Sequence, residues 1–397
     1  MNTLYLAKLQ QLQKRKLLLL FYFLLIQLAA QAQQAKITKI DTEAFGDDSR
    51  HWYGIAEPSN IINPKPNQQK YKPTDIVPVA DNILLYQKNN GGWPKNYDIM
   101  AILTEPQKDS LIKAKNILNT TFDNGTTYTH VACLADVYTA THIEKYKLAA
   151  LKGLDFIMNA QYTNGGWPQY YPLENNYSRH ITYNDGVFEG IISELKAIAD
   201  NEPQYAFVDQ KRRQKLLLSY QKGLDCILKT QIVDNGVPTA WCQQHDEVTL
   251  QPAWARAFEP PSICDGESSG IVLFLMSIDH PTPQIIHAIK NAVAWFKASA
   301  IQNTRIKTVQ APTMQTKFRV SRTDKVVETD PTAPPIWTRY YELKTHKPLF
   351  CNRDSKVVYS LAEVDRERRD GYGWYTYAPQ KAIDSYPAWA KKWNIQQ

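Results

Sequence analysis

Four polar segments of the chain carry side chains that could do chemistry on an acidic ligand. They span residues 121–128, 178–186, 253–262 and 337–354. Asp123 and Asp185 offer carboxylate oxygens, which are the ligands that a hard cation such as Ca²⁺ takes in proteins. Arg256, Arg339 and Arg353 offer planar guanidinium groups, which bind carboxylates through two hydrogen bonds. Together these residue types predict a site at which calcium bridges an acidic polysaccharide.

The two aspartates also have an ordinary structural interpretation. Asp123 and Asp185 each lie in an Asn/Asp/Gly triplet, which is common in turns. Taken alone, Asp185 is better explained as the N-cap of a helix that starts near Val187. The sequence around each residue therefore leaves both interpretations open.

Ordinary interpretations remain open for the other polar candidates as well. Arg256 could form a surface ion pair with Glu259, and His180 could be a hydrogen-bonded structural histidine. The remaining pairs expected on this interpretation are Arg339 with Glu342 and Arg353 with Asp354. Only the combination of these residues favours a functional site.

An internal repeat indicates which elements position these segments. The motif Asn-Gly-Gly-Trp-Pro occurs at residues 90–94 and again at 164–168, and a degenerate copy at 235–238 is followed by Trp241. The interval between successive copies is long enough for two helices, and such helix-pair units stack into a solenoid or close into a ring. We therefore predict an all-α fold, an α/α toroid of about three helix-pair repeats, with the repeated turns along one rim.

The apolar periodicity is helical over much of the chain. The predicted helical faces lie within residues 111–118, 151–158, 187–198, 216–228 and 285–296. We expect an extended lead-in over 33–75, and a single catalytic domain over 76–397 with its toroid over about 76–302. The remainder, about 303–397, is expected to be an irregular arm with short strands that covers the mouth of the ring.

The first 32 residues are typical of a secretory signal peptide. They contain a basic segment at Lys14-Arg15-Lys16, an apolar run over 17–30 and a small-x-small cleavage site ending at Ala32. Removal of the four basic residues of this segment lowers the formal net charge from +7 to +3. This charge does not indicate a nucleic-acid-binding protein, and the apolar run is too short for a comfortable membrane span. We expect a monomer that is secreted or periplasmic.

Five cysteines are widely spaced in the rest of the chain. Their number is odd, and no CxxC or CxxH pattern is present, so neither a disulfide framework nor a zinc site is indicated. We expect buried free thiols, with at most one or two bridges.

The order of the motifs resembles the family 10 pectate lyases over about residues 76–380. The resemblance rests on Gly-Gly-Trp-Pro, Asp-Asn-Gly, Asn-Asp-Gly-Val and Trp-Ala-Arg-Ala-Phe-Glu-Pro, and then on Arg-Tyr-Tyr-Glu and Cys-Asn-Arg-Asp in the arm. It implies an α/α toroid that cleaves polygalacturonate by calcium-dependent β-elimination. It further implies that Arg256 is the base, that Asp123 lies beside it and that Asp185 is the calcium ligand. Arg339 and Arg353 are implied to hold substrate carboxylates.

Residue type adds four further candidates for substrate binding. They are His180, Asn124, Tyr341 and Trp167. For Trp167, as for Trp93, packing in the core is at least as good an explanation as stacking on a sugar. The candidates are therefore weaker than the residues implied by the family.

The proposed base is chemically demanding, because a free arginine has a pKa above about 12. We expect calcium, Arg339 and Arg353 to disfavour the charged form of Arg256, and activity to rise into the alkaline range. One alternative is a glycoside hydrolase that pairs Asp123 with Glu259 or Asp185 as its two carboxylates. Another is a pectin-binding protein without catalysis.

Overall fold

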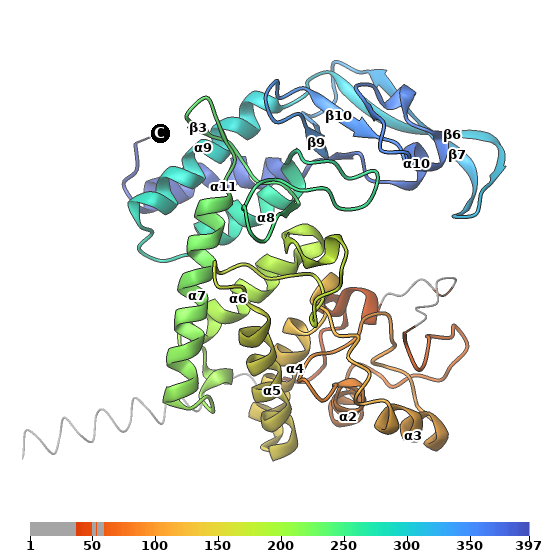
Figure 1. The fold of residues 1–397 in the computed structure, drawn as a ribbon, viewed down its shortest axis with the longest axis vertical. Helices are drawn as coiled ribbons and strands as arrows, with labels where there is room; N and C mark the ends of the chain where they lie inside the picture. The colour runs from red at the N-terminus through yellow and green to blue at the C-terminus, as the bar shows by residue number, and fades with distance from the viewer. Residues whose placement is uncertain (1–36, 50–52, 54–58, 397) are drawn as a thin grey trace, which may run out of the picture.

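The computed structural model describes residues 37–49, 53 and 59–396, so the predicted signal peptide lies outside the described residues (Figure 1). Helices are the main element. The α-helices are α2 (Ile76–Tyr86), α3 (Glu105–Lys113), α4 (Tyr128–Thr141), α5 (Glu144–Ala160), α6 (Val187–Ala199), α7 (Gln210–Thr230), α8 (Asp265–Met276), α9 (Pro283–Ser299), α10 (Arg366–Gly371) and α11 (Ala378–Lys392). Short 3₁₀ helices are η1 (Thr42–Asp48), η2 (Asp123–Gly125), η3 (Tyr177–Arg179), η4 (Asn184–Gly186), η5 (Pro203–Tyr205) and η6 (Leu361–Glu363).

Antiparallel strands join the helices, mostly in the C-terminal part. They are β1 (Ile181–Thr182), β2 (Val233–Asp234), β3 (Val237–Pro238), β4 (Gln244–His245), β5 (Ile263–Cys264), β6 (Thr304–Gln315), β7 (Val320–Thr329), β8 (Trp337–Thr338), β9 (Tyr340–Tyr341), β10 (Pro348–Cys351), β11 (Val357–Val358) and β12 (Tyr375–Thr376). Strands β11, β10, β9 and β5 form one sheet, and β1 with β4, β2 with β3, β6 with β7 and β8 with β12 form pairs.

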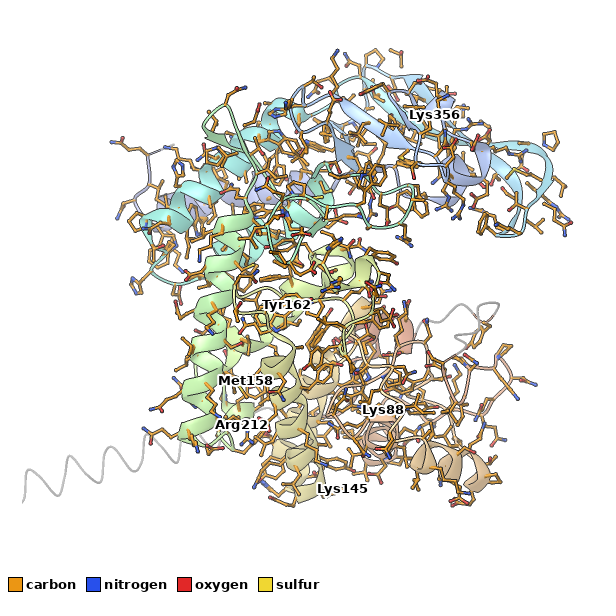
Figure 2. All side chains as sticks on the ribbon, in the orientation of Figure 1. Lys88, Lys145, Met158, Tyr162, Arg212 and Lys356 are labelled. Carbon is orange, nitrogen blue, oxygen red and sulfur yellow. The ribbon has the colours of Figure 1, made fainter. Side chains whose placement is uncertain are left out.

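The helices pack as successive pairs in two lobes. Helix α4 packs on α5, α6 on α7, and α8 on both α9 and α11. Figure 1 shows α2 to α7 in one lobe, and α8 to α11 with most strands in the other. Figure 2 draws the side chains of the described residues, with Met158, Tyr162 and Arg212 labelled in the first lobe and Lys356 in the second. The site segments lie where these lobes meet.

One tryptophan lock recurs after the helix pairs. The indole N–H of Trp93 donates to the carbonyl of Ile83 at 2.8 Å. The same bond is made by Trp167 to Ile157, by Trp241 to Ile227 and by Trp337 to Phe296. The sequence repeat is therefore a structural repeat, and Trp337 is a fourth copy that the motif search missed. The hairpin of β6 and β7 separates Trp337 from its helix.

A glutamine after the helix strengthens each of the first three copies. Gln87 donates its side-chain amide to the carbonyls of Gly91 and Ala149, both at 2.9 Å. Gln161 and Gln231 make the equivalent pairs of bonds within their own turns and to the next helix. Gly91 has φ of 98°, and a Cβ there would collide with the carbonyl of Lys152. The turn thus needs glycine both for its backbone conformation and for close packing.

The predicted helices are largely confirmed, with two errors. Helix α3 ends at Lys113, so Ile117 and Leu118 of the predicted 111–118 face are exposed loop residues. The arm over 303–397 is more regular than predicted, because it contains the long β6–β7 hairpin and two helices. All five cysteines are buried free thiols. Among the described residues, no helix has the length and apolar character needed to span a membrane.

Candidate active site

Two similar turns, η2 and η4, lie side by side at the junction of the lobes. Their middle residues, Asn124 and Asp185, have φ of 49° and 53°, the left-handed conformation that Asn and Asp tolerate better than most residues. The N-cap of α6 is Gly186, and no side chain caps this helix end. The capping interpretation of Asp185 is therefore wrong, and its carboxylate is directed elsewhere.

Asp123 is a buried carboxylate that forms an ion pair. It is 2% exposed, and its oxygens accept from Lys95 Nζ at 2.6 Å and from the Gln169 amide at 2.8 Å. Lys95 directly follows the first Gly-Gly-Trp-Pro turn, and Gln169 directly follows the second. The repeated turns thus supply the two groups that hold Asp123 in place.

The lead-in segment anchors the neighbouring Asn124. Its side-chain amide donates to Asp47 Oδ2 at 2.6 Å, while Thr126 donates to the buried Asp48 at 3.3 Å. Both aspartates belong to η1. The side-chain amide of Asn124 thus already donates a hydrogen bond within the protein. Its role in substrate binding stays a prediction.

Asp185 opens into an acidic cavity of about 340 Å³. Its carboxylate reaches solvent at the mouth, although the surrounding protein removes much of its hydration. Burial, and next the negative charge of Asp123, raise the pKa of Asp185 to about 7, and the guanidinium groups of Arg339 and Arg256 oppose this shift. These four charged groups thus act on one another at one place.

Three further carboxylates, none of them predicted, line the same cavity. Glu189 comes from the first turn of α6, and Asp265 and Glu267 come from the first turn of α8. Both carboxylate oxygens of Asp265, and one each of Glu189 and Glu267, are buried without a hydrogen-bond partner in the described structure. Burial raises the pKa of Glu189 to about 8 and raises that of Asp265 as well. The cavity therefore holds more carboxylate groups than the surrounding cations and hydrogen-bond donors can satisfy.

Arg339 is the cation that closes one side of this cavity. Its Nη2 donates at 2.8 Å both to Glu267 Oε1 and to Asn184 Oδ1. Its guanidinium carbon lies 4.9 Å from the ring centroid of Tyr372. Burial would lower the pKa of Arg339, but the negative charge of Glu267 together with Tyr340, Tyr372 and Glu259 raises it. The alternative pairing of Arg339 with Glu342 is wrong.

Arg256 pairs with Glu259, as the ordinary interpretation allowed. Arg256 Nε donates to Glu259 Oε2 at 2.7 Å, and Nη2 donates to Oε1 at 2.5 Å. The arginine side chain is 44% exposed, whereas Glu259 is buried and also accepts from the Tyr372 hydroxyl at 2.7 Å. Burial alone would lower the pKa of Arg256, but the two bonds to Glu259 raise it. The expectation that neighbouring cations lower this pKa does not hold in the free protein.

Arg353 is held outside the acidic cavity. Its Nε donates to Glu367 Oε2 at 2.7 Å, and its guanidinium carbon lies 5.1 Å from the centroid of Phe258. The Phe258 ring also faces Arg256 at 5.1 Å. The alternative pairing of Arg353 with Asp354 is wrong, and Phe258 connects Arg353 with Arg256 instead.

His180 belongs to a separate cluster with Asp246 and Glu247. Their ligand atoms lie within 4.8 Å of one another, and this trio is the one such group found among the described residues. Glu247, however, already makes a hydrogen bond with His180 Nδ1 at 3.0 Å and an ion pair with Arg179, whose Nε lies 2.6 Å from Oε1. An imidazole and a neighbouring guanidinium make this a poor site for calcium, which prefers oxygen ligands.

The two predicted aromatic contacts with sugar have no exposed ring surface. Trp167 is 0% exposed, and Tyr341 is 1% exposed and donates its hydroxyl to the carbonyl of Ser299 at 3.0 Å. Both rings lie in the core, and their polar atoms are hydrogen-bonded there. The indole N–H of Trp167 makes the repeat lock, and the hydroxyl of Tyr341 accepts from the backbone N–H of Thr338. Packing in the core, the other interpretation of the tryptophans, is the correct one.

The chain matches known proteins at the level of family and of fold. The family model for pectic acid lyase matches residues 87–383. The structure of a family 10 polysaccharide lyase from Cellvibrio cellulosa matches with a TM-score of 0.65 and 32% identity, covering 79% of this chain and 91% of that chain. A mutant of this lyase in complex with trigalacturonic acid matches with the same TM-score and 31% identity, covering 79% of this chain and 92% of that chain. No curated protein matches the chain.

The matches define an enzyme class, a lyase that acts on polysaccharides. Within this class, the chain belongs to the pectic acid lyase family, polysaccharide lyase family 10.

Proposed function

We propose that the protein is a pectate lyase that cleaves polygalacturonate by calcium-assisted β-elimination. The products would be oligogalacturonides with a C4–C5 unsaturated non-reducing end. The observation that carries this proposal is that Asp185 and Arg339 line one acidic cavity, while Arg256 lies close enough for its charge to act on Asp185. Such a site offers oxygen ligands to a cation and guanidinium groups to uronate carboxylates.

The residues that line the cavity fit a calcium ion. Asp185, Glu189, Asp265 and Glu267 supply hard oxygen donors, and several of their oxygens have no partner in the described structure. No three of these groups bring ligand atoms within 4.8 Å of one another. Water and substrate carboxylates would therefore complete the coordination. When bound, calcium would neutralise the negative charge that develops on the uronate as its C5 proton leaves.

The side chains have separate tasks in the proposed reaction. Arg339 and Arg353 hold uronate carboxylates, while Arg256 in its neutral form accepts the proton from C5. The electron pair of the C5–H bond becomes the C4–C5 double bond, the C4–O bond breaks, and the leaving oxygen takes a proton from water. Glu259 fixes the orientation of Arg256 through two hydrogen bonds. Because Glu259 also stabilises the charged guanidinium, turnover should require alkaline pH or displacement of this pair by substrate.

Hydrolysis is less well supported by the carboxylates. A hydrolase needs a protonated acid as well as a carboxylate. Burial would raise the pKa of Glu259, but the hydrogen bonds and charge of Arg256 bring it below its usual value and keep the carboxylate ionised. Asp123 is bound by Lys95 and Gln169. Neither Asp123 nor Glu259 is therefore arranged to donate a proton to a glycosidic oxygen, and Asp185, whose pKa is raised to about 7, is the one carboxylate of this alternative that could do so.

One assay separates the candidate functions. Polygalacturonate is incubated with the protein at alkaline pH, with calcium or with a chelator, and the absorbance of unsaturated uronide and the reducing ends are both followed. We expect absorbance to grow with calcium and to stop with the chelator. Reducing ends without absorbance would indicate hydrolysis instead. Binding of the polymer without either signal would indicate a pectin-binding protein.

Three further features belong to this proposal. We propose that the helix pairs, each closed by a tryptophan lock, are units of an α/α toroid. We also propose a monomer that is exported to the periplasm or beyond the cell, since residues 1–32 are typical of a signal peptide. Cell fractionation and N-terminal sequencing of the exported protein would test the proposed export, and retention of residues 1–32 in a cytoplasmic protein would contradict it.

A further inference from the structure

The β6–β7 hairpin contributes little to the core. Its strands pair only with each other, and most of their residues are exposed or half-buried. A two-stranded hairpin is marginally stable in water by itself. This hairpin, which lies beside α10 in Figure 1, therefore depends on contacts with the rest of the protein.

Polar contacts with α10 hold the second strand of the hairpin. Asp370 accepts from the Thr323 hydroxyl at 3.0 Å and pairs with Arg319 Nη2 at 3.1 Å. Asp324 in turn accepts two bonds from Arg369, at 2.8 and 2.7 Å. The turn between the two strands is thereby fixed relative to the end of β10, where Arg353 lies.

At the turn, an aromatic ring lies between cations and solvent. Phe318 is 50% exposed, and its ring centroid lies 3.5 Å from the guanidinium carbon of Arg353. Lys317 Nζ lies 4.9 Å from the same centroid. A half-exposed phenyl ring beside two cations offers a flat face on which a sugar can stack.

These groups continue the row that leads to the proposed base. From Phe318 the row passes through Arg353 to Phe258 and on to Arg256, with separations between guanidinium carbon and ring centroid of 3.5, 5.1 and 5.1 Å. A chain of uronate sugars suits the exposed groups of this row, because Phe318 offers a ring to the apolar face of a sugar and Arg353 and Arg256 offer cations to carboxylates. The Phe258 ring is buried and only connects the two arginines. Among the described residues, no acidic side chain forms an ion pair with Lys317.

We propose that Lys317 and Phe318 form an outer binding subsite for a uronate residue remote from the bond that is cleaved. Phe318 stacks on the sugar and supports Arg353, and Lys317 pairs with the carboxylate. The proposal rests on the proposed function, since it takes the same acidic polysaccharide as ligand. It makes the hairpin an element that lengthens the binding surface for long chains.

The test compares Phe318→Ala and Lys317→Ala with the control Lys307→Ala, which removes one charge from the same hairpin where Lys307 pairs with Glu328. Affinities for octagalacturonate and trigalacturonate are measured by calorimetry with a chelator present, so that no turnover occurs. Phe318→Ala and Lys317→Ala should each weaken octamer binding by about three- to tenfold. Binding of the trimer, which does not reach the tip, should change less than about twofold.

Equal losses for both oligomers in Phe318→Ala would mean that Phe318 only supports Arg353, and would overturn the subsite. Unchanged octamer binding would overturn it as well. Phe318→Tyr, which keeps the ring, should behave like the wild type, and thermal melting checks that each variant is folded. A wild type that binds octamer through Phe318 but produces no unsaturated sugar would refute the lyase proposal and keep the subsite. If the wild type is an active lyase and the variants bind octagalacturonate with unaltered affinity, the subsite is refuted and the lyase proposal stands.

Discussion

The two turns that carry Asp123 and Asp185 share their turn chemistry but differ in electrostatic environment. In η2 the left-handed position is taken by Asn124, and the preceding Asp123 is buried against Lys95 and Gln169. In η4 the aspartate itself is left-handed and opens into the acidic cavity. A shift of the carboxylate by one position in the turn thus separates an aspartate that is ion-paired with Lys95 from one that forms no ion pair in the described structure.

Charge balance indicates what the second turn lacks. The cavity holds four carboxylates, one guanidinium, and the N-termini of α6 and α8, each of which acts as roughly half a positive charge. If all carboxylates ionise, about two negative charges remain, which one divalent cation or two protons would neutralise. At η2, Lys95 already supplies the charge that Asp123 needs. The difference predicts that the affinity for calcium depends on Asp185 and not on Asp123.

The largest expected effect is that of Asp185→Asn. Loss of this charge should weaken calcium binding by about 100-fold and should lower turnover of polygalacturonate by about 10³-fold. Calorimetry measures the first change, and absorbance of the unsaturated product measures the second. Asp200→Asn, at an exposed ion pair with Lys196, is the matched control and should leave both unchanged. Normal calcium affinity in Asp185→Asn would remove the basis of the comparison.

Replacement of Arg256 should stop the chemistry while sparing the cation. Arg256→Lys loses the fork that pairs with Glu259, so turnover should fall by about 10²- to 10⁴-fold with calcium affinity unchanged. Stopped assays of product absorbance, together with calcium titrations, separate the two effects. Near-normal turnover in this variant would show that Arg256 is not the base.

The pH profile gives an independent check on Arg256. The Glu259 carboxylate raises the pKa of Arg256, so the activity of the wild type should increase into the alkaline range. Glu259→Gln removes this charge and should move the rise to lower pH, whatever it does to the maximum. A profile that is flat from about pH 5 to about pH 10 would contradict the assignment.

A smaller effect is expected from Asp123→Asn. The change leaves Lys95 without its carboxylate and should lower kcat/KM by about 10- to 100-fold through misplacement of nearby groups. Calcium affinity should stay within about threefold of the wild type, since Asp123 does not line the acidic cavity. A loss of calcium binding as large as that of Asp185→Asn would mean that both turns hold the ion.

The smallest effect concerns stability and pH. Burial raises the pKa of Glu194, whose carboxylate accepts from Tyr205, from 4.5 to about 8, and raises that of Glu189 to about 8. The folded protein therefore keeps protons that the unfolded chain releases near pH 4.5, and the free energy of unfolding should fall as pH rises from there to 8. Calcium should offset the part due to Glu189, whereas Glu194→Gln should remove a part that calcium does not affect. Denaturant titrations at several pH values measure both, and identical curves for Glu194→Gln and wild type would contradict the assignment.

The sequence predicted the features that depend on local spacing. Repeated Gly-Gly-Trp-Pro turns and apolar periodicity indicated the helix pairs, because each turn needs glycine and each helix needs one buried face. Trp337 was missed because the β6–β7 hairpin interrupts its repeat unit. Helix α11, which contains Pro387 in its interior, was missed at the end of the segment expected to be an irregular arm.

Charge pairing in the site could not be predicted from spacing alone. Glu267 lies 72 residues from Arg339 in the chain, and Glu367 replaces the adjacent Asp354 as the partner of Arg353. Acidic residues in the first turn of a helix, such as Asp265, are ordinary, and only the folded structure brings Asp265 to the same cavity as Asp185. Lys95 and Gln169 had a usable signal, since each directly follows a copy of the repeated turn.

The most direct test is a calcium titration of the initial rate of unsaturated-product formation in the wild type, Asp185→Asn and Asp123→Asn. We predict a saturable calcium requirement whose half-maximal concentration rises by about 100-fold in Asp185→Asn and by less than about threefold in Asp123→Asn. A rate that does not depend on calcium, or equal displacement of the titration in both variants, would contradict the account.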